Sequence, residues 1–452
     1  MLIDQGELTT AFPEFIVSRG KGSEMKVVYA EVVANDLKNI GHRDSITGKA
    51  IHGVYDLFYP DGGDSKKFTT LSYRTFRYIQ LDITTSDEAF VIEKLGSWFT
   101  AYPFEKKSNF ITSNFVANKD DLADIVRIGW HTARLCAYET YMDCPYWERL
   151  QYIGDTRIQA LISYYNTEDD RLARNALQQF ERSLQYDGLT YSRYPSSLPH
   201  YIPNYSLVWV LMVNDFMMYR NDPEFVRTFL PGIKRVVEHF KKYLTLDKMM
   251  GMQPYWDFLD HSYDTRKVFE TSNIKKLTTN SLFYAHTLDK AAEIFSYLED
   301  NQTADEYKSL SEQIKESVKK QCWDAASKMY ADTPDKKIFS MHSNILAVLC
   351  GMMPTCHAWS ASPNFEILAT IAGIESASPE FTTVTIRPQF QKVDGIIASV
   401  PHWAGGIVVM LGVKNKELKG GISLPKGITG KLEWEGRIIE LREGDNKINL
   451  KM

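Results

Sequence analysis

The chain is poor in cysteine and has no long hydrophobic or basic run. Five cysteines among 452 residues, without a Cys-x-x-Cys spacing, argue against a disulfide framework or a zinc site and predict reduced thiols in a cytoplasmic protein. No stretch approaches the ~20 consecutive apolar residues that cross a membrane, and residues 1–20 lack the basic and apolar regions of a secretory signal. A formal charge of −5, with no Lys- or Arg-rich run, argues against nucleic acid as the partner.

Several catalytic signatures are also absent. The sequence has no Gly-x-Gly-x-x-Gly, no Walker phosphate loop and no His-Glu-x-x-His, and neither Ser360 nor Ser362 lies in a Gly-x-Ser-x-Gly setting. Nucleotide-dependent, zinc-protease and serine-nucleophile chemistry are therefore not expected, and neither is a metal or another cofactor. What the chain does have is 44% hydrophobic residues and 13% aromatic ones, which are enough for several packed cores.

Three segments with different hydrophobic periods follow one another. Residues 1–114 alternate apolar and polar residues, as in Met25–Val32 and Tyr73–Ile83, and predict an N-terminal β-sandwich. Residues 115–378 change to the helical period and predict roughly eight to nine helices. Strands return in residues 379–452 and predict a second, smaller β-sandwich.

The helical segment combines long helices with long loops. The predicted helices begin near Leu122 and continue as Thr156–Tyr165, Asp169–Leu184, Ser206–Tyr219, Pro223–Tyr243, Thr279–Tyr297, Ala304–Gln321 and Met341–Cys350. Two aromatic-rich loops, Tyr186–Tyr205 and Gly251–Asn273, exceed the ~12–15 residues beyond which a loop is usually functional. Since no fixed repeat is present, a barrel of paired helices is favoured over a regular solenoid.

The segment Asp143–Asp155 (DCPYWERLQYIGD) has the densest group of chemically active side chains. Pro145 predicts a loop, and the helix expected from Thr156 places Asp155 at its N-cap. Capping explains Asp155 at least as well as ligand binding does.

Glu148 follows Trp147, and an aromatic neighbour can desolvate a carboxyl and raise its pKa, as a general acid requires. From spacing alone, an ion pair with Arg149 or Arg157 is the favoured explanation of this glutamate.

Aromatic residues in the loops suggest a sugar ligand, because flat rings can stack on the apolar face of a sugar. Trp256 lies in a long loop with two acids, Asp257 and Asp260, close after it, and sugar stacking and simple packing are about equally good explanations. Trp209 is expected in the core of its helix. His357, in the segment His357–Asn364 (HAWSASPN), could donate to a sugar hydroxyl, although such a histidine is more often structural.

These blocks, in this order, resemble the α-L-rhamnosidases of glycoside hydrolase family 78. The resemblance rests on Asp143–Asp155 and His357–Asn364, is supported by Tyr73–Gln80 (YRTFRYIQ) and Thr383–Pro388 (TVTIRP), and covers almost the whole chain. It implies an (α/α)₆ barrel flanked by β-sandwich domains. It also implies hydrolysis of terminal α-L-rhamnosides with inversion, so that the partner is a rhamnose-containing oligosaccharide or glycoside.

The resemblance also implies roles for particular residues. Glu148 takes the position of the general acid. Asp143 and Asp155 take positions that bind rhamnose hydroxyls, a task that suits carboxylates because their hydrogen bonds are charge-assisted. Tyr152, Trp256 and His357 take positions that line the sugar pocket.

One departure from the family pattern concerns the general base. The family has a Glu in a Thr-Thr-aromatic-x-Glu type segment shortly before the HAWSASPN block, whereas Lys336–His357 contains no Asp or Glu. We interpret Met353–Thr355 as the junction of a deletion near residues 354–355, which leaves the barrel incomplete. Glu366, in an expected helix over Phe365–Ala372, lies in the wrong register to replace the base.

Three functions remain open at this point. The first is an inverting α-L-rhamnosidase with Glu148 as general acid. The second is a catalytically impaired or silent rhamnoside-binding homologue that lacks the base. The third is another (α/α)₆ glycosidase that acts on a different sugar.

Overall fold

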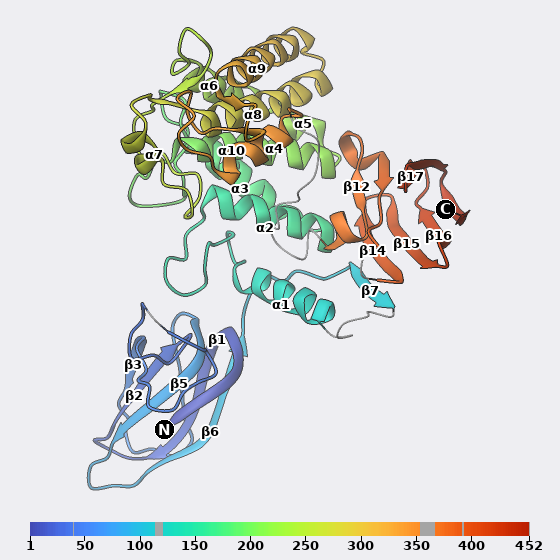
Figure 1. Ribbon diagram of the computed structural model, residues 1–452. Coiled ribbons are helices and arrows are strands. Elements are labelled where there is room, and N and C mark those ends of the chain that lie inside the picture. Colours follow the sequence, from blue (N-terminus) through green and yellow to red (C-terminus); the bar gives the residue numbers. More distant parts are fainter. Residues whose placement is uncertain (39, 114–120, 353–366, 391–392, 452) are drawn as a thin grey trace. The chain divides into compact units, whose positions relative to one another are not determined.

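The computed structural model describes residues 1–38, 40–113, 121–352, 367–390 and 393–451 (Figure 1). The chain forms two compact units. The first unit comprises Met1–Pro103 and Thr132–Arg149, and the second comprises Phe104–His131 and Leu150–Met452. A helical region and several β-sheets are therefore combined in one chain, as the changes in hydrophobic period predict.

The first unit is built on a six-stranded sheet with the order β3-β2-β5-β1-β4, in which β6 also pairs with β1. Its strands are β1 (Leu2–Arg19), β2 (Glu24–Ala30), β3 (Val54–Phe58), β4 (Lys66–Thr69), β5 (Arg74–Thr84) and β6 (Phe90–Phe99). Strands β2 and β5 are the two that the alternating pattern predicts. Phe15, Tyr29 and Phe76 are fully buried in the core beneath them.

The second unit contains most of the helices. They are α2 (Ile153–Asn166), α3 (Arg171–Arg182), α4 (Pro203–Tyr219), α5 (Pro223–Arg227), α6 (Leu230–Lys241), α7 (Thr265–Thr271), α8 (Thr278–Tyr297), α9 (Asn301–Cys322) and α10 (Met341–Leu349). Helix α1 (Asp121–Leu135) precedes them in the chain. Helix α8 packs against both α4 and α9 and is mostly buried. Trp209 on α4 is fully buried, as expected, and its indole N–H donates to the carbonyl of Leu177 at 3.2 Å.

Some helical predictions need correction. The single helix expected over Pro223–Tyr243 is two helices, α5 and α6, and Pro231 lies in the first turn of the second. Helix α7, inside the long loop after residue 251, was not predicted. The helix expected over Phe365–Ala372 is described only from Ile367, where the chain forms the π-helix η1 (Ile367–Ile371).

The C-terminal part of the second unit contains two sheets. A five-stranded sheet has the order β19-β16-β15-β14-β7, and a four-stranded sheet has the order β12-β13-β17-β18. Their strands are β7 (Asn109–Ser113), β12 (Ile374–Ser376), β13 (Thr383–Ile386), β14 (Gly395–His402), β15 (Gly405–Lys414), β16 (Glu417–Leu424), β17 (Thr429–Trp434), β18 (Arg437–Leu441) and β19 (Gly444–Lys451). The early strand β7 pairs antiparallel with β14, so a segment from before the helices completes the C-terminal sheet.

Two pairs of short antiparallel strands lie between helices in the second unit. They are β8 (Met250–Gly251) with β9 (Lys276–Leu277), which have α7 between them, and β10 (Trp323–Asp324) with β11 (Met329–Tyr330). Within the described residues, no helix combines the length and the apolar character needed to cross a membrane.

Candidate active site

The segment that carries Asp143 and Glu148 belongs to the first unit and is held there by hydrogen bonds. Thr75 Oγ1 donates to the carbonyl of Pro145 at 2.6 Å. The hydroxyl of Tyr146 donates to the carbonyl of Tyr29 at 3.0 Å and accepts from the N–H of Val54 at 3.0 Å. The loop expected at Pro145 is therefore fixed against the sheet rather than left free.

Glu148 has an exposed side chain, and Asp143 is half-buried. The N–H of Glu148 donates to Sγ of Cys144 at 3.3 Å, which tightens the turn between them. Trp147 is 64% exposed and meets the ring of Tyr146 edge-on, with ring centroids 5.0 Å apart. Exposure leaves Glu148 accessible to a ligand and gives little desolvation from its own unit.

The two arginines considered as partners of Glu148 have other prominent contacts. The guanidinium of Arg149 lies over the ring of Tyr73, 4.7 Å from its centroid. Arg157 lies in the second unit, where its Nε donates to Asp215 at 2.7 Å and joins α2 to α4.

In the second unit, Asp155 lies in the first turn of α2 and is not its N-cap. The helix begins at Ile153, Tyr152 is the N-cap residue, and the side chain of Tyr152 makes no capping hydrogen bond. The expectation of capping is therefore wrong by one turn. Asp155 is half-buried, and a carboxylate in the first turn still interacts favourably with the helix dipole.

Gly154 beside it lets an aromatic ring approach the helix. A Cβ at this position would lie 3.1 Å from both Cζ and Oη of Tyr205. Burial raises the pKa of Tyr205, and the negative charge of Asp155 raises it further. Tyr205 is therefore a neutral phenol beside Asp155.

Tyr152 and Trp256 belong to one group of rings in the second unit. We call Tyr152, His200, Trp256, Phe258 and Tyr205 the aromatic cluster. His200 meets Tyr152 and Trp256 edge-on, with ring centroids 6.2 and 5.8 Å apart. Phe258 lies 4.8 Å from Trp256 and 6.2 Å from Tyr205, again between ring centroids.

The cluster has polar groups at its edges. Arg193 donates to the hydroxyl of Tyr152 at 2.7 Å, and Nδ1 of His200 forms a hydrogen bond with Oγ of Ser192. Trp256 remains 44% exposed. An exposed indole beside phenols, an imidazole and a carboxylate can bind a ligand that has both an apolar face and hydroxyl groups.

The half-buried carboxylate of Asp257 anchors the loop that carries Trp256. Asp257 accepts from Nδ2 of Asn280, and Nδ2 of Asn204 lies 3.3 Å from its Oδ1. Asn204 also donates to the carbonyl of Phe258 at 3.2 Å, and Thr265 donates to the carbonyl of Asp257 at 2.7 Å. Burial raises the pKa of Asp257, whereas the two amide donors lower it.

Sequence reasoning missed Arg193, His200 and Tyr205, and it considered Asp257 only as one of two acids near Trp256. Three of them lie in the two aromatic-rich loops whose length indicated function, and Tyr205 lies at the end of one of them and in the first turn of α4. His357 and the deletion junction near 354–355 lie outside the described residues. Among the described residues, no group of three or more His, Cys, Asp or Glu side chains could hold a metal ion.

A family model matches the helical region and gives the class of the protein, that of the six-hairpin glycosidases. A family model described as the bacterial α-L-rhamnosidase six-hairpin glycosidase domain matches residues 111–366, more than half of the chain. The chain belongs to this family, which confirms the resemblance to the family 78 enzymes. No curated protein sequence matches it.

Solved structures of rhamnosidases share the fold. The family 78 rhamnosidase of Bacillus sp. GL1 matches with a TM-score of 0.77 and 19% identity, over 95% of this chain and 54% of that one. The α-L-rhamnosidase of Aspergillus terreus matches with a TM-score of 0.74 and 13% identity, over 99% and 62%. The Streptomyces avermitilis α-L-rhamnosidase, solved with L-rhamnose, matches with a TM-score of 0.72 and 14% identity, over 100% and 52%. The chain thus spans little more than half the length of these enzymes.

Proposed function

We propose that the chain is a glycoside hydrolase that releases terminal α-L-rhamnose with inversion of configuration. The observation that carries the proposal is the family match over residues 111–366, because this range includes both the Asp143–Asp155 block and the aromatic cluster. The likeness to a rhamnosidase solved with L-rhamnose supports the same sugar. A rhamnose-containing glycoside is therefore the proposed substrate.

In the proposed mechanism, Glu148 gives its proton to the departing glycosidic oxygen. A second carboxylate activates a water on the opposite face of the sugar, and inverting enzymes hold the two carboxyl groups ~6.5–9.5 Å apart to admit this water. Asp143 and Asp155 accept hydrogen bonds from rhamnose hydroxyls. Tyr152, Trp256 and His357 form the wall of the sugar pocket, and the exposure of Trp256 supports this role.

The proposed architecture is an (α/α)₆ barrel, incomplete because of the deletion near residues 354–355, between two β-sandwich domains. The described cysteines, Cys136, Cys144, Cys322 and Cys350, form no disulfide bond with one another, which supports the proposed cytoplasmic location. The absence of any Asp or Glu from Lys336–His357 favours one alternative, a rhamnoside-binding homologue with impaired or no catalysis.

Turnover of an aryl α-L-rhamnoside by the purified chain tests the proposal. We expect release of the aryl group by the wild type and a loss of ~10²–10⁴-fold in Glu148→Gln, because the amide cannot donate the proton to the leaving group. Glu435→Gln is the matched control, since Glu435 is exposed in the turn between β17 and β18.

The outcomes separate the two functions. Equal rates in the wild type and Glu148→Gln would remove Glu148 from the mechanism. Saturable binding of L-rhamnose without turnover by the wild type would favour the silent homologue. Faster hydrolysis of an aryl α-glucoside than of the rhamnoside would contradict the proposed sugar.

A further inference from the structure

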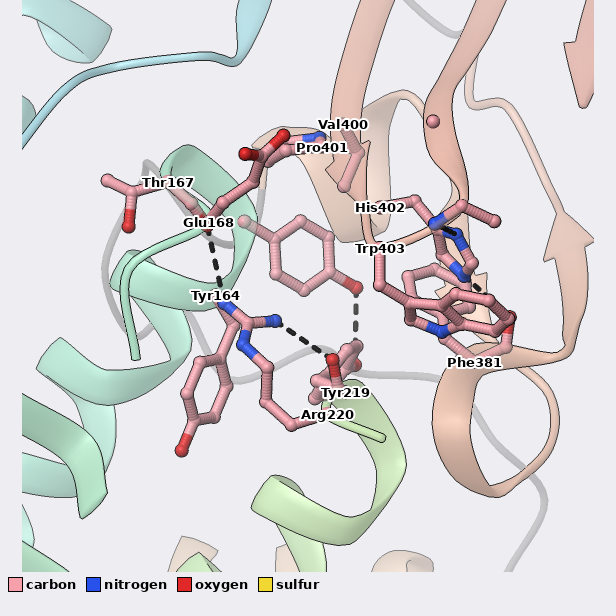
Figure 2. A pocket seen from close by; sticks show the side chains of 13 residues that line it. Tyr164, Thr167, Glu168, Tyr219, Arg220, Phe381, Val400, Pro401, His402 and Trp403 are labelled. Atoms are coloured by element: carbon pink, nitrogen blue, oxygen red, sulfur yellow. Dashed lines mark hydrogen bonds between the residues drawn. The ribbon is translucent and has the colours of Figure 1, made fainter. Parts of the chain in front are cut away.

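A pocket lined by aromatic residues, none of them from the aromatic cluster, lies between the helices and the C-terminal strands of the second unit. Its volume is about 470 Å³, within the ~300–1,000 Å³ of small-molecule sites. Figure 2 shows Trp403, His402 and Phe381 on one side and Tyr164 and Arg220 on the other. The lining therefore comes from the carboxyl ends of α2 and α4 and from the turn between β14 and β15.

Trp403 offers an exposed and fixed ring to this pocket. Its side chain is 54% exposed, and its indole N–H donates to the carbonyl of Glu380 at 2.6 Å. One face of the ring lies against His402, with ring centroids 5.0 Å apart. Because the Trp403 ring is already held in place, its side chain loses little conformational entropy when a ligand stacks on it.

The turn that Trp403 contacts is held in a strained conformation from several directions. Glu380 and Phe381 have positive φ angles of 63° and 57°. The hydroxyl of Tyr297 donates to the carboxylate of Glu380, and Nε2 of the buried His402 donates to the carbonyl of Phe381 at 2.9 Å. Strain of this kind persists only where the surroundings enforce it, so this wall of the pocket is preorganised.

The polar groups of the pocket carry no net charge that a ligand must neutralise. Arg220 donates to the carbonyls of Tyr219 and Thr167 at 2.9 and 3.3 Å, and its Nε lies 3.8 Å from the carboxylate of Asp170. The carboxylate of Glu168 pairs with Lys107 at 2.8 Å. Both charges at the pocket are thus balanced by partners within the protein.

A phenol pair supplies hydrogen-bonding capacity. Tyr165 donates its hydroxyl proton to the carbonyl of Ile374 at 2.9 Å, so Tyr219 is the donor in the 3.2 Å contact between the two hydroxyls. The Tyr219 oxygen therefore keeps lone pairs that can accept a hydrogen bond. A neutral ligand with hydroxyl donors fits this arrangement.

We propose that this pocket is a second carbohydrate site that binds one neutral pyranose unit, with its C–H face stacked on Trp403 and its hydroxyls turned towards Tyr219. A pyranose combines an apolar face, a rim of hydroxyl donors and no charge, which are the three properties that the lining matches. The argument rests on this pocket alone, and the proposed hydrolysis only supplies L-rhamnose as the first probe.

Fluorine NMR of the full chain labelled with 5-fluorotryptophan tests the site directly. The nine tryptophans give separate probes, and Trp403→Phe assigns the resonance of interest. We expect a saturable shift of the Trp403 resonance on titration with L-rhamnose or D-glucose. Trp98 is the matched control because it is also exposed, at 64%, and its indole N–H also donates to a protein oxygen, that of Glu14.

The variants are compared by isothermal titration calorimetry with D-glucose, because Trp403→Ala removes the resonance itself. Trp403→Ala should weaken sugar binding at least tenfold, whereas Trp98→Ala should leave it unchanged. A Trp403 resonance that stays fixed up to ~100 mM of either sugar would overturn the proposal. A shift caused by indole and by neither sugar would overturn the assignment to a carbohydrate. A sugar-dependent shift without rhamnoside turnover would support this site while contradicting the proposed hydrolysis, and the converse result would contradict this site alone.

Discussion

Asp257 accepts hydrogen bonds from one amide group, Nδ2 of Asn280, through both of its carboxylate oxygens, at 3.0 and 2.9 Å. The aspartate lies next to the exposed Trp256, whereas Asn280 lies in the first turn of α8. Asn204, in the first turn of α4, approaches the same carboxylate at 3.3 Å. The loop with the indole is therefore anchored to the starts of two buried helices, and one side chain connects all three.

Replacement of this carboxylate should act on both stability and substrate binding. Asp257→Ala leaves the buried amide group of Asn280 without an acceptor, which costs about 1–3 kcal/mol, and leaves Asn204 with only the carbonyl of Phe258. We expect a lower free energy of unfolding and, because the loop of Trp256 is released, a higher KM for an aryl α-L-rhamnoside with a smaller change in kcat. Urea denaturation and steady-state kinetics measure the two effects.

Asp257→Asn is the conservative control. Oδ1 of Asn204 and Oδ1 of Asn280 are buried without a hydrogen-bond partner, so the new amide can accept from one asparagine and donate to such an oxygen. We expect stability and KM to return most of the way to the wild-type values. A KM that rises equally in both variants would show that the carboxylate itself contacts the substrate.

The carboxyl group of Asp257 should also make the free energy of unfolding depend on pH, in a direction that its raised pKa fixes. Burial raises the pKa of Asp257 in the folded protein above the ~3.9 of an unfolded aspartate. Between these values the folded state holds a proton that the unfolded state has released, so its contribution to stability decreases as the pH rises through this window. The free energy of unfolding of the wild type minus that of Asp257→Asn should therefore fall from pH 4 upwards. A difference that rises with pH would contradict the raised pKa.

His286 on α8 should give the opposite pH dependence, a stability that increases as the pH rises. Burial lowers its pKa to about 3, and the nearby positive charge of Arg157 adds to the effect. Below the ~6.5 of an unfolded histidine, the unfolded state binds a proton that the folded state refuses, so stability is lost as the pH falls from about 6.5 towards 3.

The measurement compares His286→Gln with the wild type by urea denaturation at several pH values. The variant should lack an acid-side slope of up to about 1.4 kcal/mol per pH unit. His42→Gln is the control, because the side chain of His42 is 78% exposed. Parallel stability curves for His286→Gln and the wild type between pH 4 and 6 would exclude this role.

The sequence predicts most of the helices because their apolar residues recur clearly at the helical period. The helix expected over Ser206–Tyr219 is α4, and that expected over Thr279–Tyr297 is α8 within one residue. Strand β7 was not distinguishable from its neighbours, since its pairing with β14 joins residues almost 300 positions apart and no local pattern encodes it.

The candidate site also contains residues that the sequence motifs suggest and residues that only the folded structure brings together. The motif resemblance implies that Tyr152, Asp155 and Trp256 line the sugar pocket, and this role stays a prediction. His200 and Asp257 depend on contacts between loops and on burial, which the sequence does not show. The cap assigned to Asp155 failed because Ile153 and Gly154 are already helical, although neither residue is a strong start signal.

Gly154 and Tyr205 should be energetically coupled. Gly154→Ala places a methyl group 3.1 Å from Cζ and Oη of Tyr205, whose ring also packs edge-on against Phe258. We expect the variant to lose about 1–2 kcal/mol of stability, the usual cost of overpacking, although alanine favours the helix. In a Tyr205→Ala background the contact is gone, and the same substitution should instead stabilise the protein by roughly 0.5–1 kcal/mol through helix propensity. A double-mutant cycle of urea denaturation measures this change of sign, and an equal effect of Gly154→Ala in both backgrounds would show that Tyr205 is free to move away.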